Sequence, residues 1–223
     1  MRDSLWKRAT RLAFDLAASP RELSRYVRYS SVFSRRRPVD LRLPWITFRA
    51  IDILANMARP GTRVLEWGSG GSTLFFADLG CEVLSIEHDA KWASIVQDSL
   101  TTEQRKRIDI QVHDVRSDIA EFADSSYVCA PLGREFDVIL VDGFTDYHGI
   151  HRNLCFATAE AVAARDSVIL IDDIWMFPEV STSRADFSRT IEGIGPARLG
   201  VTATVIFAYG ECAKHLACRL GRG

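Results

Sequence analysis

Residues 62–73 decide the fold: they read TRVLEWGSGGST, a short apolar run that leads directly into a glycine-rich turn. The run RVLEW (63–67) has the length and composition of a buried strand, and a helical pattern follows over 72–79. Glycine lets the backbone turn sharply and approach a ligand closely, beside the positive N-terminus of the helix. The stretch therefore predicts a strand, a turn and a helix, with a ligand bound at the turn.

Short apolar runs and helical patterns alternate from this point to the end of the chain. Such alternation is typical of a parallel sheet with both faces covered, so we expect an open, doubly wound, Rossmann-like α/β domain. The last run, within ARLGVTATVIFAY (197–209), has no crossover helix and is expected to form a terminal hairpin on that sheet. The expected strands are 63–67, 82–87, 108–113, 136–142, 167–173 and 202–209, and the expected helices are 72–79, 90–100, 117–123, 149–164 and 184–192.

The composition indicates a globular protein. The 223 residues are 47% hydrophobic and 26% charged, which excludes bulk disorder and collagen-like repeats. The five cysteines form no CxxC pair, so neither a disulfide framework nor a zinc knuckle is expected, and a reducing compartment is favoured. No apolar run approaches the length of a membrane span, and the cytoplasm is the expected compartment.

The N-terminal residues 1–43 differ from the rest in charge. They hold 11 Lys or Arg against 4 Asp or Glu, a net +7, whereas residues 44–223 carry a net −8. We therefore expect a basic helical appendage (1–43) before the main domain (44–223). Its first helix is amphipathic, with Leu5, Ala9, Leu12 and Leu16 on one face and Lys7, Arg8 and Arg11 away from it. Either the appendage meets an anionic surface or partner, or it docks on its own acidic domain.

Two further helices are expected before the first strand. Ser19-Pro20-Arg21-Glu22 combines an N-cap serine, a proline at the first helical position and a capping-box glutamate. The segment Trp45 to Met57 has helical apolar spacing and stops before Pro60-Gly61.

Three acidic residues follow the first three strands, where ligands bind in doubly wound sheets. The glycine turn is neither the dinucleotide motif GxGxxG nor a phosphate-binding loop, since Thr73 takes the last glycine's place and a GK[ST] lysine is missing. Glu66 suits a cationic ligand, because a carboxylate pairs with an ammonium group. Glu87 can accept both hydroxyls of a ribose. Asp114 can take an adenine amino group, or it can cap the next helix.

Taken together, ExGxGGST, the acid after strand two, the Asp after strand three and FDVILVDG resemble the class I S-adenosylmethionine-dependent methyltransferases over roughly residues 45–210. The resemblance implies a seven-stranded sheet with the cofactor across the first two strand ends. Ser72 stands where many members carry a third glycine, as in the branch resembling small-molecule and sugar O-methyltransferases. The cofactor contacts that it implies are Glu66, Gly68, Ser69, Gly70, Ser72, Glu87, Asp114, Val115 and Asp142.

Three carboxylates end the fourth and fifth strands: Asp142, Asp172 and Asp173. Like charges held together are costly unless they are protonated or bridged by a cation, and an all-oxygen set suits Mg²⁺. This arrangement resembles the metal-dependent O-methyltransferases, so we expect a Mg²⁺ site here. In the alternative, Asp142 only borders the cofactor and the other two acids cap the next helix.

A base is also needed to take a proton from an acceptor hydroxyl. Asp142, Asp146 and His148 are the candidate catalytic residues, with Tyr147 and His151 beside them. The expected activity is methyl transfer from S-adenosylmethionine to oxygen of a small-molecule or sugar-like acceptor. The alternatives are a non-catalytic cofactor-binding partner subunit and a nicotinamide-dependent oxidoreductase. The chain carries no strong nucleic-acid signal, and homo-oligomerisation is left open.

Overall fold

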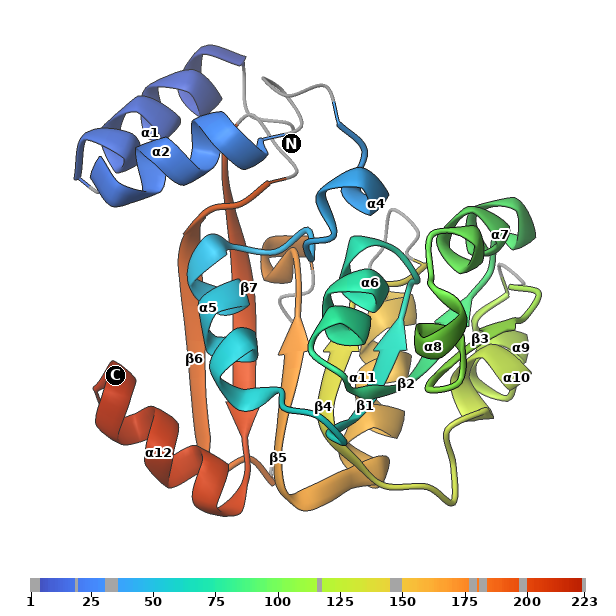
Figure 1. Ribbon diagram of the computed structural model, residues 1–223. Coiled ribbons are helices and arrows are strands. Elements are labelled where there is room, and N and C mark those ends of the chain that lie inside the picture. Colours follow the sequence, from blue (N-terminus) through green and yellow to red (C-terminus); the bar gives the residue numbers. More distant parts are fainter. Residues whose placement is uncertain are drawn as a thin grey trace.

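The computed structural model describes residues 5–18, 20–30, 36–115, 118–144, 150–176, 180, 184–196 and 200–221. A seven-stranded sheet with helices on both faces forms its centre (Figure 1). The strand order is β3-β2-β1-β4-β5-β7-β6, and β7 is antiparallel to both of its neighbours. The strands are β1 (Arg63–Trp67), β2 (Glu82–Glu87), β3 (Ile108–Val112), β4 (Phe136–Val141), β5 (Ala163–Ile171), β6 (Phe187–Ile194) and β7 (Val201–Ala208).

The helices connect these strands in the order that a doubly wound sheet requires. Four come before β1, and the others lie between strands or after β7. The α-helices are α1 (Leu5–Ala18), α2 (Pro20–Tyr29), α4 (Pro38–Leu41), α5 (Phe48–Met57), α6 (Gly71–Asp78), α7 (Ala90–Asp98), α8 (Thr102–Arg105), α9 (Ile119–Ala123), α10 (Ser126–Cys129), α11 (Ile150–Val162) and α12 (Gly210–Leu220), and a 3₁₀ turn, η1, spans Ile174–Met176.

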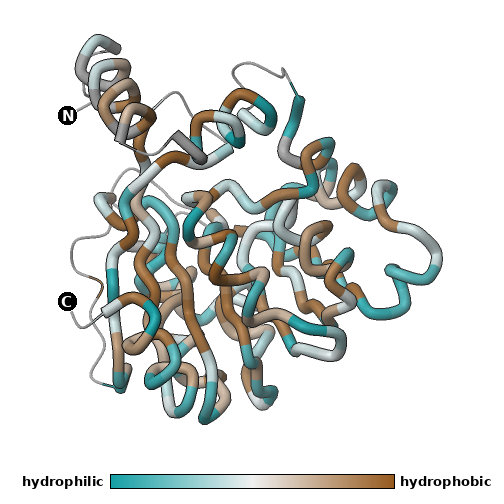
Figure 2. Tube along the Cα trace, turned by 60° about the vertical axis from the view of Figure 1, so that its left-hand side comes forward, coloured by the Kyte–Doolittle hydropathy of each residue, from teal (hydrophilic) through white to brown (hydrophobic). Residues whose placement is uncertain are grey.

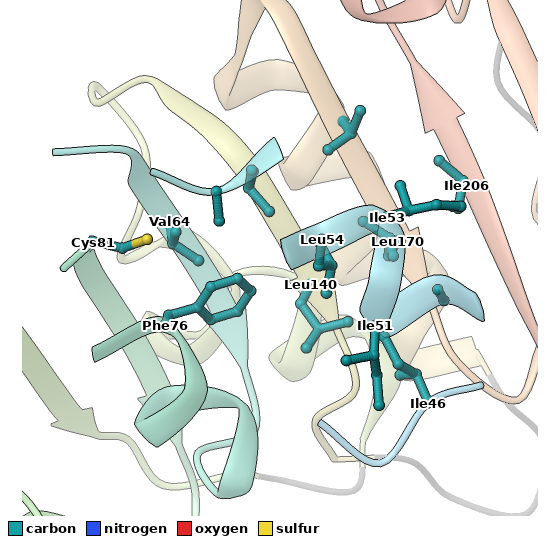
Figure 3. Close-up of a cluster of buried hydrophobic side chains, with 14 of the residues drawn as sticks. Ile46, Ile51, Ile53, Leu54, Val64, Phe76, Cys81, Leu140, Leu170 and Ile206 are labelled. Atoms are coloured by element: carbon teal, nitrogen blue, oxygen red, sulfur yellow. The ribbon is translucent and has the colours of Figure 1, made fainter. Parts of the chain in front are cut away.

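Successive side chains along the central strands belong to two separate cores, one on each face of the sheet. Leu65 and Ile139 pack in the core that α9, α10 and α11 cover, whereas Val64, Leu140 and Leu170 pack in the core beneath α5 and α6. Figure 3 shows the second of these cores, where Leu54 and Phe76 meet the strands. Burial on both faces explains why the strands read as nearly continuous apolar runs.

The strand order reverses between β1 and β4, which pair in parallel from Val64↔Val138 to Trp67↔Val141. The chain runs from β1 to β2 and β3 on one side, then returns to β4 and β5 on the other. The connections leave this edge in opposite directions, so a crevice opens beyond the carboxyl ends of β1 and β4. The glycine turn after β1 and Asp142 after β4 border that crevice.

The N-terminal segment packs on the same core as the sheet. Leu12 of α1, Tyr26 of α2 and Val39 of α4 are buried in the core beneath α5. In Figure 1 the α1–α2 hairpin lies at the end of the sheet toward which the parallel strands point. The boundary expected at residue 43 stays a prediction. None of the described helices has the length and apolar character needed to cross a bilayer.

Two expectations for the C-terminal part were wrong. Residues 184–192 were expected to be helical, but Phe187–Ile194 forms β6, which pairs with β7 along its whole length from Phe187↔Ala208 to Ile194↔Val201. Exposure alternates along FSRTIEGI, and the apolar Ile191 points inward, so the segment has the period of a strand. The expected hairpin is therefore made of β6 and β7, and it is followed by α12, which the sequence analysis did not predict.

The expected helix over 45–57 begins three residues later, at Phe48. Thr47 caps it by accepting a hydrogen bond from the Ala50 amide at 3.3 Å. Trp45 consequently stands outside the helix and lines the crevice described below.

Candidate functional site

The glycine turn after β1 needs glycine most at its first position. Gly68 has φ +93°, and a Cβ there would lie 2.8 Å from the carbonyl oxygen of Asp142. Gly70 has extended backbone, and the nearest atoms to a Cβ there are 3.9 Å away, on Trp92. Gly68 therefore lets the turn pass close to the end of β4, while Gly70 keeps the pocket wall free of a side chain.

Glu66 lies behind this turn and is completely buried. Its carboxyl accepts hydrogen bonds from the hydroxyls of Ser72 at 2.6 Å and of Thr73, both in the first turn of α6. Burial raises the pKa of Glu66 to about 7, although these two hydrogen bonds act to lower it. Glu66 is outside the pocket lining, so here it supports the turn, and its contact with an ammonium group stays a prediction.

Glu87 at the end of β2 is the centre of a dense hydrogen-bond network. Its Oε2 accepts from the Ser69 amide at 2.8 Å and from the Ser69 hydroxyl at 3.0 Å. Its Oε1 accepts from the amides of His88 and Asp89 at 2.8 and 2.9 Å, and His88 Nδ1 is also 2.8 Å away. Burial acts to raise the pKa of Glu87, but the hydrogen bonds from His88, Asp89 and Ser69 outweigh it and hold that pKa below its ordinary value. Glu87 is thus a fixed anion at the pocket wall.

A pocket of about 550 Å³ lies over these groups, at the crevice where the strand order reverses. This volume is in the ordinary range for a small-molecule site. The glycine turn and Glu87 form one part of the wall, and Trp92 anchors it by donating a hydrogen bond from Nε1 to the Ser69 carbonyl at 2.7 Å. The lining residues are Arg37, Trp45, Gly68, Ser69, Gly70, Gly71, Ser72, Glu87, His88, Asp89, Trp92, Asp142 and Gly143.

The expected adenine contacts after β3 lie apart from this lining. Asp114 is exposed, and Val115 packs on the core beneath α9. The structure therefore groups Glu87 with the glycine turn but not with Asp114 or Val115, and their adenine role stays a prediction.

The carboxylate of Asp142 is paired with a cation that the sequence analysis did not single out. Arg152, in the first turn of α11, is buried and places its Nη2 atom 3.0 Å from Asp142 Oδ1. The same guanidinium donates from Nη1 to the Asp172 carbonyl at 2.9 Å, and from Nε and Nη2 to the Gly143 carbonyl at 3.3 and 3.2 Å. Arg152 therefore ties the ends of β4 and β5 together.

The expected Mg²⁺ site at these strand ends was wrong. The carboxylates of Asp172 and Asp173 accept hydrogen bonds from two threonines of β7, Thr204 at 2.8 Å and Thr202 at 3.1 Å. Burial, and then the charges of Asp142 and Asp173, raise the pKa of Asp172 well above its ordinary value. No group of three or more His, Cys, Asp or Glu side chains in the described part of the chain can hold a metal ion. Protonation of Asp172 and the guanidinium of Arg152 relieve the repulsion instead.

Two of the candidate bases, Asp146 and His148, lie outside the described residues, as do Tyr147 and Phe177. Asp142 is described and lines the pocket. His151 is buried against aromatic rings, with its centroid 4.4 Å from that of Phe122 and 5.0 Å from that of Phe144, so it belongs to the core. Trp175 and Met176 are about half exposed and are not part of the pocket lining.

Sequence reasoning missed several residues that the fold brings to the pocket: Arg37, Trp45, His88, Trp92 and Arg152. Arg37 and Trp45 come from segments before β1, where no local motif marks a ligand. Arg152 is the single Lys or Arg within 150–162, and a lone arginine in a helix is usually solvated, so its sequence carries no usable signal.

No protein-family model and no curated protein sequence matches this chain, but solved structures do. A candidate rRNA methylase from Clostridium thermocellum superposes with a TM-score of 0.54 at 12% identity, over 73% of this chain and 94% of that one. The O-methyltransferase TomG from Streptomyces achromogenes, involved in tomaymycin synthesis and solved with S-adenosylmethionine, gives 0.51 at 16% identity, over 83% and 99%. An rRNA methylase from Streptococcus thermophilus gives 0.51 at 10% identity, over 78% and 98%.

These similarities establish the fold of the class I S-adenosylmethionine-dependent methyltransferases for this chain. The seven-stranded sheet that the sequence resemblance implied is thus confirmed. Structures of the same fold carry names for different acceptors, rRNA and small molecules among them, so the fold leaves the acceptor open.

Proposed function

We propose that this protein transfers a methyl group from S-adenosylmethionine to an oxygen atom of a small-molecule or sugar-like acceptor. The observation that carries the cofactor is the fixed anion of Glu87 beside the glycine turn, on the wall of a 550 Å³ pocket in a methyltransferase fold. Support for the acceptor comes from the sequence resemblance, in which Ser72 stands at the position of the third glycine. When bound, S-adenosylmethionine supplies an electrophilic methyl group on sulfonium.

The network around Glu87 suits a ribose with its two neighbouring hydroxyls. A carboxylate has about four lone-pair sites, whereas Glu87 receives five donors from Ser69, His88 and Asp89. The three backbone amides are fixed by the turn, but the Ser69 hydroxyl and the His88 ring can rotate away. Ribose hydroxyls would replace these two side-chain donors and leave the amides in place.

Asp142 is the described residue best placed to act on an acceptor hydroxyl. It lines the pocket from the end of β4, opposite Glu87, and Arg152 holds its carboxylate. The guanidinium keeps Asp142 ionised, so the carboxylate can accept a hydrogen bond from the acceptor and orient its oxygen toward the methyl group. Trp45 and Trp92 add apolar wall, which restricts water at the reacting atoms.

The decisive test is cofactor binding by Glu87→Gln, measured by isothermal titration with S-adenosylmethionine. We expect binding to weaken by about 1–3 kcal/mol, because the ribose hydroxyls lose a charged acceptor. Glu82→Gln is the matched control, because Glu82 lies at the other end of the same strand, is exposed and is remote from the pocket lining. Circular dichroism must show both variants folded, and Glu87→Asp is measured as well in case Glu87→Gln fails to fold.

Unchanged affinity in folded Glu87→Gln would refute the cofactor assignment. Transfer of labelled methyl to a panel of hydroxylated small molecules and sugars then tests the reaction. Binding without turnover on any acceptor would favour the non-catalytic partner subunit, and binding of a nicotinamide cofactor in place of S-adenosylmethionine would favour the oxidoreductase.

A further inference from the structure

The α1–α2 hairpin exposes large apolar side chains on the side away from its own core. In α1, Leu12 is buried and Leu16 half-buried against the core, whereas Trp6 and Phe14 are 80% and 77% exposed. At 100° per residue, Trp6 and Phe14 lie well away from the Leu12–Leu16 face. Helix α1 thus has two apolar faces, and the protein's own core uses one of them.

Helix α2 repeats this pattern. Tyr26 is buried, whereas Leu23 and Val27, one turn apart, are 44% and 54% exposed. Figure 2 shows hydrophobic positions along both N-terminal helices, which stand above the sheet. Exposed apolar residues concentrated in one short element mark an interaction surface, since scattered single ones are the norm elsewhere.

The charge of the hairpin indicates what this surface meets. Residues 5–30 contain six Lys or Arg and two Asp or Glu, a net +4, on a protein whose residues 44–223 carry −8. One printed ion pair joins the hairpin to that acidic body, Arg25 to Asp52 at 2.8 Å, and Arg28 is exposed beside the ring of Tyr29. The hairpin is held to the body chiefly by apolar packing, so its positive charge is directed at an external partner.

We propose that the α1–α2 hairpin docks on anionic lipid bilayers, with Trp6 and Phe14 inserted at the headgroup boundary and the basic residues against the headgroups. Exposed Trp and Phe with a basic helix are the composition of interfacial anchors, whereas a nucleic-acid surface needs the charge but not the exposed aliphatic pair of α2. The hairpin lies at the pocket end of the sheet, and Arg37, a few residues beyond α2, lines the pocket (Figure 1). Docking would therefore bring the pocket mouth toward the membrane.

The test is co-sedimentation of the full chain with phosphatidylcholine vesicles, with and without phosphatidylserine. We expect binding that requires phosphatidylserine and falls as salt is raised, because screening shortens the range of the attraction. Trp6→Ser combined with Phe14→Ser should lower the vesicle partition coefficient by at least about tenfold. The matched control is Val112→Ser combined with Leu132→Ser, two residues that are 45% and 51% exposed outside the hairpin.

Three outcomes would overturn the proposal. These are no sedimentation with either vesicle, equal binding to neutral and anionic vesicles, and wild-type binding by the Trp6/Phe14 double variant. Binding of RNA in a gel-shift assay without vesicle binding would assign the surface to nucleic acid instead. All four substituted side chains are exposed, and circular dichroism checks that each double variant is folded.

Discussion

The buried carboxyl of Glu66 makes the stability of this protein depend on pH in a predictable way. Its pKa is about 7 in the folded chain against 4.5 for an unperturbed glutamate, because the side chain is fully buried. At about 1.4 kcal/mol per pKa unit, the difference corresponds to about 3 kcal/mol. Between these two values the folded state holds more protons than the unfolded state. The stabilisation is therefore complete below pH 4.5 and is lost as pH rises through 7.

Glu66→Gln removes this titration while keeping the shape of the neutral side chain. We expect the free energy of unfolding of the wild type, relative to Glu66→Gln, to fall by up to about 3 kcal/mol between pH 4.5 and pH 8. Urea denaturation of both proteins across this range measures the difference, in which the titration of all other groups cancels. Glu82→Gln, at an exposed position of β2, should track the wild type at every pH.

A parallel pH dependence of wild type and Glu66→Gln would refute this reasoning. It would mean that Glu66 ionises in the folded chain as readily as in the unfolded one. The hydrogen bonds from Ser72 and Thr73 would then outweigh the cost of burying the charge.

Two further predictions concern the strand ends. Arg152→Met should lower the free energy of unfolding by about 3–5 kcal/mol, because it leaves Asp142 without its buried partner, whereas Arg105→Met, from the exposed pair with Asp98, should cost less than about 1 kcal/mol. Equal losses in denaturant titration would contradict the bridging role of Arg152. Gly143→Ala should cost about 1–3 kcal/mol, since its Cβ would collide with the buried Tyr127 hydroxyl and lie 2.9 Å from the Trp67 carbonyl carbon, while Gly193→Ala meets nothing within 4 Å. A thermal unfolding midpoint in Gly143→Ala equal to that of Gly193→Ala would show that the strand ends can move apart.

The central strands were predictable because their signal is local. Runs such as FDVILV and SVILI are apolar at every position, as burial on both faces of a parallel sheet requires, and the structure has strands there. Residues 187–194 were not predictable in the same way. Their alternation is short, and their state depends on pairing with β7, which follows after a connection that sequence reasoning cannot place.

The candidate site divides along the same line. Glu87 and the glycine turn were found because each follows a strand directly, so the parallel sheet brings them to one edge. The metal hypothesis failed because the spacing of Asp142, Asp172 and Asp173 says where the backbone ends but not where the carboxylates point. Two threonines of β7 and an arginine of α11 settle that direction.

The sequence by itself determined the fold class, the edge of the sheet where a ligand binds and the excess of positive charge near the N-terminus. These depend on hydrophobic periodicity, glycine and net charge, which act over neighbouring residues and need no knowledge of distant contacts. The tertiary structure alone decided that Arg152 pairs with Asp142, that Trp45 and Arg37 reach the pocket, and that Trp6 and Phe14 face outward. Each is a contact, or the lack of burial, between segments far apart in the chain, and packing of the whole core sets it.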